Sequence, residues 1–241
     1  VYLQECNVSQ VYHQAPYLVT HAKEALLTQQ VNITYKEAIT GNDKDKWIPA
    51  IEHEFFCMES LGVWKPLALQ KVPQGMKPIP CHWVFEIKDN GTHYRARLVA
   101  KGFAQKPGID FKDAYSRVMQ DTTLRFLLTL LLGKYCKLVA ELYDIKTSFL
   151  YGLLDKIVYM QCPEGYEDRI PQGHVLMLLK AIYRLVQAAC AFYESLSHHL
   201  TEPCQRFLHI NADLCVFYSQ DEKGLVITGI HVDDGFVIGD K

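Results

Sequence analysis

The segment that covers residues 81–100 constrains the fold more than any other part of the sequence. Large apolar side chains alternate with other residues in its first half, as on a half-buried strand: Trp83, Phe85 and Ile87. Asn90 and Gly91 follow, and both residue types tolerate the positive φ angles that a tight turn needs. The sequence therefore predicts an antiparallel β-hairpin here.

The return strand of this hairpin carries a basic face. Three cations and one valine share that face: Arg95, Arg97, Val99 and Lys101. At about 3.3 Å per residue its ends stand about 20 Å apart, which suits a triphosphate and a neighbouring nucleic-acid backbone. The alternative is a solvent-exposed face on an edge hairpin, where Lys and Arg discourage aggregation.

Charge is distributed unevenly along the chain, although its formal net charge is only -2. Residues 63–106 contain eight Lys and Arg against two acidic residues, whereas residues 207–241 contain six acidic residues against two Lys. This separation suits a polyanion on one side and metal ions on the other. Solvated surface charge is the alternative.

Helices and strands are predicted along most of the chain. Apolar spacing indicates a helix that begins at Asp43 or Asp45 and ends near Leu61. Further predicted elements are a buried helix over 121–132, strands over 138–145, 158–160 and 213–218, a helix over 188–200, and a hairpin within 224–239. Because these elements are interspersed without strict alternation, an α+β fold is favoured. No apolar stretch approaches the ~20 residues that span a bilayer, so no membrane association is expected.

Three aspartates stand at positions that suit metal-assisted phosphoryl transfer. Asp144 ends a predicted strand, and Asp233-Asp234 lies between two apolar runs. Two divalent metals held by carboxylates neutralise the attacking and leaving oxygens in such reactions. The 14 Asp of this chain make about one Asp-Asp pair expected by chance, and turns favour Asp anyway. The pair therefore indicates a metal site only because apolar runs flank it and because Asp144 ends another predicted strand.

A series of short motifs begins near Thr34–Ala38 and Trp47 and continues to the end of the chain. They are, in order, Trp83–Phe85, Arg95–Phe103 (RARLVAKGF), Gln105, Gly108–Asp110, Asp144–Leu150 (DIKTSFL), Gly152, Val158–Met160, Pro163–Gly165, Lys180–Tyr183, Gln187-Ala188 and Val232–Asp234. In this order the chain resembles the reverse transcriptase domain of copia-type retrotransposon polyproteins.

The resemblance implies a right-hand polymerase in which an antiparallel palm sheet is packed with helices. Residues 1–33 would be a leader or linker, and residues 34–241 the reverse transcriptase domain. Within that domain, 34–119 and 153–187 would form mainly fingers, and 120–152 and 188–241 mainly palm. The chain ends soon after the Asp-Asp pair, so no thumb is expected and a fragment is indicated.

The same resemblance assigns roles to individual residues. Asp144, Asp233 and Asp234 would be catalytic and would hold two Mg²⁺ ions, with Mn²⁺ as a substitute and Asp233 a firmer ligand than Asp234. Two residues would contact the incoming nucleotide, Phe149 as the aromatic gate beneath its sugar, and Gln187. Arg95, Arg97 and Lys101 are the candidates for gripping the triphosphate, and the sequence does not distinguish among them.

The implied activity is RNA-directed DNA synthesis. The partners would be an RNA or DNA template with its primer, deoxynucleoside triphosphates, and the remainder of a Gag-Pol-like polyprotein with integrase and RNase H. By analogy the setting would be a cytoplasmic virus-like particle.

Several positions depart from the family's pattern. Arg184 replaces a turn glycine, which predicts backbone strain if its φ is positive. His231 replaces a tyrosine, Gly235 replaces a β-branched residue, and Val186 and Cys190 replace two cations. The alternative function is therefore a catalytically inactive retroelement remnant that at most binds nucleic acid.

Overall fold

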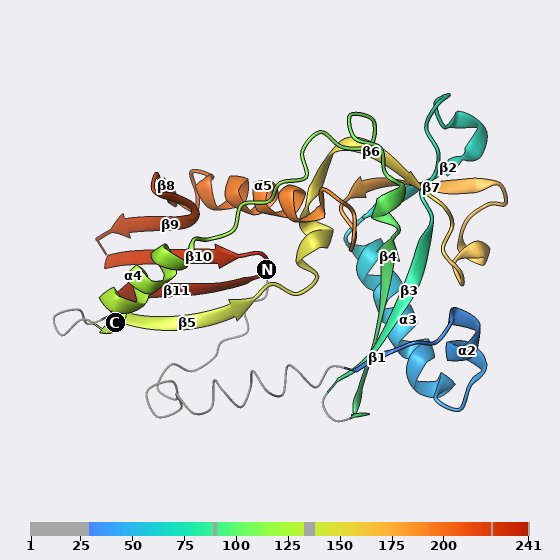
Figure 1. The fold of residues 1–241 in the computed structure, drawn as a ribbon, viewed down its shortest axis with the longest axis horizontal. Coiled ribbons are helices and arrows are strands. Elements are labelled where there is room, and N and C mark those ends of the chain that lie inside the picture. The colour runs from blue at the N-terminus through green and yellow to red at the C-terminus, as the bar shows by residue number, and fades with distance from the viewer. Residues whose placement is uncertain (1–28, 89–90, 133–137, 223, 241) are drawn as a thin grey trace.

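The computed structural model describes residues 29–88, 91–132, 138–222 and 224–240, and arranges them as three antiparallel sheets with helices (Figure 1). The predicted α+β class is confirmed. Most of the predicted leader, residues 1–28, lies outside the described residues. The end of that segment is not a loose linker: Gln29–Val31 forms strand β1, which pairs with β3.

The predicted hairpin is confirmed. Strand β3 (Cys81–Lys88) pairs with β4 (His93–Ala100), and Trp83 lies opposite Leu98. Gly91 has φ +94°, as the turn requires, whereas Asn90 is not among the described residues. One face of β4 packs into the core through Tyr94, Ala96, Leu98 and Ala100. The opposite face, which carries Arg95 and Arg97, is left to line a cavity.

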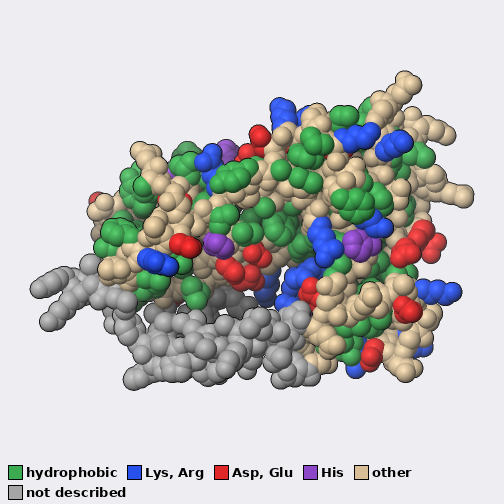
Figure 2. Space-filling model, in the orientation of Figure 1, with side chains coloured by type: hydrophobic (Ala, Val, Ile, Leu, Met, Phe, Trp, Pro, Cys, Tyr) green, Lys and Arg blue, Asp and Glu red, His purple; other side chains and the backbone are tan. Residues whose placement is uncertain are grey.

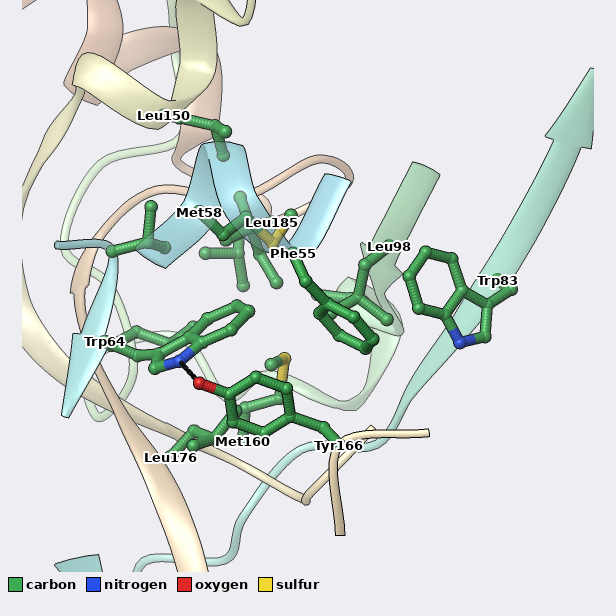
Figure 3. Close-up of a cluster of buried hydrophobic side chains, with 14 of the residues drawn as sticks. Phe55, Met58, Trp64, Trp83, Leu98, Leu150, Met160, Tyr166, Leu176 and Leu185 are labelled. Carbon is green, nitrogen blue, oxygen red and sulfur yellow. Dashed lines mark hydrogen bonds between the residues drawn. The ribbon is translucent and has the colours of Figure 1, made fainter. Parts of the chain in front are cut away.

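A second sheet and two helices complete this half of the molecule. The sheet has the order β2 (Trp64–Ala68), β7 (His174–Lys180) and β6 (Leu153–Met160), so the predicted strand 158–160 is the end of a longer one. Helices α2 (Tyr35–Thr40) and α3 (Lys44–Ser60) precede it, and α3 begins after Asp43. Their shared core centres on the side chains in Figure 3, where the Trp64 indole donates to the Tyr166 hydroxyl at 3.2 Å.

The other half of the molecule is built on a five-stranded sheet. Its order is β5 (Leu138–Asp144), β11 (Asp234–Asp240), β10 (Gly224–His231), β9 (Asp213–Asp221) and β8 (Leu208–Ile210). Helices α4 (Asp121–Leu132) and α5 (Ala188–Thr201) pack against this sheet. Helix α4 is not buried as predicted, because Phe126 is 62% and Leu128 is 45% exposed, although Leu127 is buried.

Short 3₁₀ helices connect these elements: η2 (Leu69–Lys71), η4 (Gly102–Ala104), η5 (Ser148–Tyr151) and η6 (Glu167–Arg169). Helix η5 leads from β5 of the five-stranded sheet to β6 of the other half. Leu150 in η5 is fully buried in the larger core, and the Gly152 carbonyl accepts a hydrogen bond from Ala181 N–H at 2.7 Å. The crossing between the halves is thus fixed by packing and by backbone hydrogen bonds.

None of the helices in the described ranges is long and apolar enough to cross a membrane.

A buried carboxyl group ties α3 to the hairpin. Glu54 is 6% exposed, and its Oε1 accepts the Leu98 N–H at 3.1 Å. Burial raises the pKa of Glu54 to about 7, against the lowering effects of that hydrogen bond and of nearby Arg95 and Arg97. The carboxyl group therefore takes up a proton on folding in weakly acidic solution.

This proton uptake predicts a pH-dependent stability. Between the ordinary Glu pKa of 4.5 and about 7, the unfolded chain loses the proton and the folded chain keeps it, so the free energy of unfolding should fall as pH rises. Glu54→Gln should remove about 2 kcal/mol of that decline, measured by urea denaturation between pH 5 and 7.5. Glu141→Gln, at an exposed carboxylate of β5, is the matched control and should leave the decline intact. Identical pH profiles for Glu54→Gln and the wild type would contradict the assignment.

Candidate functional site

A cavity of about 1210 Å³ lies where the two halves of the molecule meet. Its acidic side is formed by Asp144, Asp233 and Asp234 from the ends of β5 and β11 and the turn before β11. Its basic lining comes mainly from the hairpin and neighbouring loops: Lys46, Lys88, Arg95, Arg97, Lys146 and Arg184. In Figure 2, acidic and basic side chains lie beside a hollow near the middle of the visible face.

Strand pairing brings the three aspartates together. Asp144 is the register partner of Asp234, although 90 residues separate them in the chain. Residues directly opposite each other on antiparallel strands have Cβ atoms about 4.5–5.5 Å apart. The carbonyl of Asp233 accepts a hydrogen bond from Ile145 N–H at 3.0 Å, which holds the turn beside the end of β5.

The turn that carries Asp233 is strained. His231 pairs with Asp234, so Val232 and Asp233 form a two-residue hairpin loop. Val232 has φ +62°, a conformation that is rare for a β-branched residue and normally assigned to glycine. The predicted hairpin tip is therefore confirmed, with Asp233 in the loop and Asp234 as the first residue of β11.

Gly235 allows a close approach between the two strands. A Cβ on Gly235 would lie 2.2 Å from the ring of its register partner, Tyr143. The Tyr143 hydroxyl is within 2.9 Å of Thr228 Oγ1 on β10. Glycine after the acidic pair thus lets Tyr143 cover β11 and reach β10 next to Asp144.

The carboxylates influence one another electrostatically. The pKa of Asp234 is raised, first by partial burial and then by the negative charges of Asp233 and Asp144, while His231 opposes the shift. A cation placed among these groups would relieve the repulsion. Carboxylate oxygens are also the donors that hard divalent cations prefer, so the residues present fit such an ion.

The side chains are not already arranged as a complete metal-binding cluster. Within the described ranges, no three His, Cys, Asp or Glu side chains are grouped closely enough to hold one ion. Asp144 and Asp234 are nevertheless register partners, so the strand pairing already places the two residues opposite each other.

The two hairpin arginines differ in their surroundings. Arg97 Nη1 pairs with Glu86 Oε1 at 2.6 Å, and its guanidinium lies 5.7 Å from the Tyr183 ring centre. Arg95 lines the same cavity, and no carboxylate in the described part of the chain lies within ion-pair distance of it. Arg97 is therefore largely neutralised, whereas the charge of Arg95 remains available.

Phe149 lies on the cavity wall in η5. Its ring contacts two others edge to face, Tyr183 at 5.8 Å and Phe192 at 6.3 Å between centres. Aromatic contacts of this geometry restrict the orientation of a ring. Phe149 thus contacts both the segment before α5, through Tyr183, and α5 itself, through Phe192.

Two predicted nucleotide-binding residues do not line this cavity, namely Gln187 and Lys101. Gln187 is 3% exposed, accepts a hydrogen bond from Gln105 Nε2 at 3.0 Å and donates one to the Asp110 carbonyl at 3.1 Å. Lys101 follows β4, and its backbone N–H donates to the Pro80 carbonyl at 2.9 Å. The nucleotide-binding roles of both residues stay predictions.

The expected strain at Arg184 is present, because its φ is +64°. Arg184 lines the cavity, as do four residues to which the sequence analysis assigned no role: Lys46, Glu54, Lys146 and Tyr183. Lys146 and Tyr183 lie within quoted motifs, and Lys146 follows the strand-end Asp144 by two residues. Lys46 and Glu54 come from α3, and their convergence on the cavity depends on the tertiary fold.

Comparisons with known proteins match most of the chain. The family model described as "Reverse transcriptase (RNA-dependent DNA polymerase)" matches residues 63–241. The chain is 34% identical over 209 residues to the retrovirus-related Pol polyprotein from transposon TNT 1-94 of Nicotiana tabacum. It is 28% identical over 250 residues to that from transposon RE2, and 30% identical over 208 residues to that from transposon RE1, both of Arabidopsis thaliana.

These alignments cover 85%, 96% and 85% of this chain, in the same order. They cover only 15%, 17% and 14% of the relatives. The chain therefore spans about one sixth of the length of the polyproteins it resembles.

The strained turn predicts a stabilising substitution. Val232→Gly should raise the free energy of unfolding by about 1 kcal/mol, because relief of roughly 1–3 kcal/mol of backbone strain exceeds the roughly 0.5–1 kcal/mol entropic cost of glycine. Urea denaturation at neutral pH measures the change. Val226→Gly, the same substitution within β10, is the control and should destabilise the protein. The strain assignment fails if both variants lose stability equally.

Proposed function

Because the chain belongs to the reverse transcriptase family, in the form carried by copia-type retrotransposons, we propose that it performs RNA-directed DNA synthesis. The reaction is nucleotidyl transfer from a deoxynucleoside triphosphate to a primer 3′ end paired with a template. Members of the family use divalent metal ions.

One arrangement carries this function: an acidic strand edge faces a basic hairpin across a single cavity. Asp144, Asp233 and Asp234 supply the acidic edge, and Arg95 lies on the basic side. A nucleoside triphosphate with its metal ions needs both, because the phosphates require cations and the ions require carboxylates. Acidic and basic residues on separate surfaces could not bind the metal ions and the phosphates of one nucleotide together.

We assign the five-stranded sheet with α4 and α5 to a palm, and the two smaller sheets with α2 and α3 to fingers. Residues 138–144 and 208–240 supply all five strands of the larger sheet, which supports 120–152 and 188–241 as mainly palm. The smaller sheets draw on residues 29–100 and 153–180, which supports 34–119 and 153–187 as mainly fingers.

In the proposed reaction the primer 3′ oxygen forms a bond to the α-phosphorus. At the same time the bond between the α-phosphorus and the oxygen that bridges the α- and β-phosphates breaks. Pyrophosphate leaves, and the proton of the 3′ hydroxyl passes to solvent. Two bound Mg²⁺ ions, or Mn²⁺ in their place, would stabilise negative charge on the attacking and leaving oxygens. The carboxylates of Asp144, Asp233 and Asp234 would hold these ions, and the turn that includes Val232 fixes where Asp233 stands.

Among the three candidate cations, we propose Arg95 as the residue that grips the triphosphate. Its charge has no carboxylate partner among the described residues, whereas Arg97 is paired with Glu86 and packed over Tyr183. Arg97 then serves to order the hairpin face. Lys101 lies outside the cavity lining and is the weakest of the three candidates.

Phe149 is proposed as the gate beneath the sugar, since its ring stands on the cavity wall close to the acidic edge. A ring in that place would clash with a ribose 2′ hydroxyl. Gln187 is proposed to contact the nucleotide after its present hydrogen bonds to Gln105 and Asp110 have been exchanged.

The proposed partners follow from the same chemistry. An RNA or DNA template and its primer would bind largely through phosphates, so binding would weaken with salt. The relatives are Pol polyproteins, and we propose that this domain likewise acts beside integrase and RNase H segments of a polyprotein, within a cytoplasmic virus-like particle.

Primer extension on poly(rA)–oligo(dT) tests the proposed activity. With Mg²⁺ or Mn²⁺ the wild-type chain should incorporate dTTP, and Asp144→Ala or Asp233→Ala should lower incorporation at least a hundredfold, because each removes a metal-binding carboxylate. Asp155→Ala, at an exposed acid on β6, is the control and should retain activity. No incorporation with either metal would support the inactive-remnant alternative.

Nucleotide binding tests the assignment of the cation. Arg95→Ala should weaken dTTP binding about tenfold in an equilibrium titration, because it removes the unpaired cation. Lys71→Ala, at an exposed residue of η2 outside the cavity, should leave binding unchanged. Equal effects of the two substitutions would return Arg95 to the role of a solvent-exposed charge.

A further inference from the structure

We infer that Tyr183 is a positioning residue for deoxynucleotide selectivity, because its ring holds Phe149 in place against the cavity. The inference rests on the proposed function and names a residue that determines the specificity of that same site.

The backbone of Tyr183 is fixed to the hairpin. Its carbonyl accepts a hydrogen bond from Ala100 N–H at 2.9 Å, and Tyr183 forms a parallel bridge with Val99. Tyr183 therefore lies along the edge of β4, next to the strand that carries Arg95 and Arg97. Any displacement of the Tyr183 backbone would have to break its pairing with this strand.

The Tyr183 ring contacts two cavity residues at once. Phe149 approaches it at 5.8 Å with an interplanar angle of 89°, and the Arg97 guanidinium lies 5.7 Å from its centre. Phe192 of α5 makes a second edge contact with Phe149, at 6.3 Å between ring centres. Phe149 thus contacts two rings, and Tyr183 is the one attached to the hairpin.

These contacts matter because a steric gate works only if its ring cannot move aside. A bulky side chain excludes a 2′ hydroxyl by occupying the space that the hydroxyl would need. If Phe149 could rotate away from the ligand, a ribonucleotide would be accommodated at little cost. Tyr183 and Phe192 restrict that rotation through edge-to-face contacts.

The Tyr183 hydroxyl has a separate environment that makes a clean test possible. It is buried, and no hydrogen-bond partner for it exists among the described residues. Burial raises the pKa of this hydroxyl to about 12, so it stays protonated at neutral pH. Arg95 lies near this hydroxyl and favours its ionised form, against the effect of burial. The edge-to-face contact with Phe149 is made by the ring, so phenylalanine should reproduce it.

The experiment compares dATP and ATP as competitors of a fluorescent deoxynucleotide, with Ca²⁺ present so that binding is measured without turnover. The wild-type chain should prefer dATP. Tyr183→Leu should reduce the preference about two- to tenfold, mainly by strengthening ATP binding, because the loss of one aromatic contact loosens Phe149. Tyr183→Phe should keep the wild-type preference.

Two controls separate selectivity from stability. Tyr159→Leu makes the same substitution at a buried tyrosine of β6 that does not line the cavity, and it should leave the preference unchanged. If Tyr183→Leu does not fold, Tyr183→Met fills more of the ring volume and carries the same expectation. If Tyr183→Phe keeps the preference for dATP while Tyr183→Leu or Tyr183→Met reduces it, the aromatic ring is the positioning group.

Failure of the inference differs from failure of the proposed function. Phe149→Ala should abolish the preference for dATP if Phe149 is the gate. If Phe149→Ala lowers the preference and Tyr183→Leu does not, or if Tyr183→Phe loses as much as Tyr183→Leu, the inference is overturned and the gate stands. A wild-type chain that binds neither nucleotide, or a Phe149→Ala variant that keeps the preference, would overturn the proposed site and the inference with it.

Discussion

The pairing of β5 with β11 is the interaction on which the rest of the site depends. It places Asp144 opposite Asp234 and brings the Asp233 carbonyl to Ile145 N–H. Because side chains alternate along a strand, a shift of one residue in this register would turn Asp144 to the other face of the sheet. The close fit of Tyr143 over Gly235 opposes such a shift, since any other residue there would meet the ring.

The basic side of the cavity is ordered by a different set of interactions. Glu54 accepts a hydrogen bond from Leu98 N–H of the hairpin, and Glu86 forms an ion pair with Arg97 on the hairpin itself. The ion pair with Glu86 reduces the charge of the hairpin that a ligand would meet. Arg95 remains as the hairpin cation without a carboxylate partner in the described part of the chain, so the effective charge is smaller and better localised than a count of Lys and Arg indicates.

Backbone strain concentrates around the same cavity. Four non-glycine residues in the described ranges have positive φ, and two of them, Thr147 and Arg184, line the cavity, while Val232 adjoins Asp233. Strained conformations persist where the surrounding structure holds them, and they are frequent at functional sites. Here the surrounding structure is the strand pairing on one side and the buried η5 segment on the other.

The sequence by itself determined those helices and strands whose apolar residues recur with a regular period, including the hairpin over 81–100, and it determined the acidic turn. Its ordered motifs identified the family. It did not reveal β7, a continuous apolar run without alternation, or α2, which has only six residues and too few turns for an apolar period. Only the tertiary structure decided which charges are neutralised, that Gln187 is buried, and that Tyr183 supports Phe149. The physical reason is range: periodicity and turn chemistry act between neighbouring residues, whereas ion pairs and ring contacts depend on how distant segments pack.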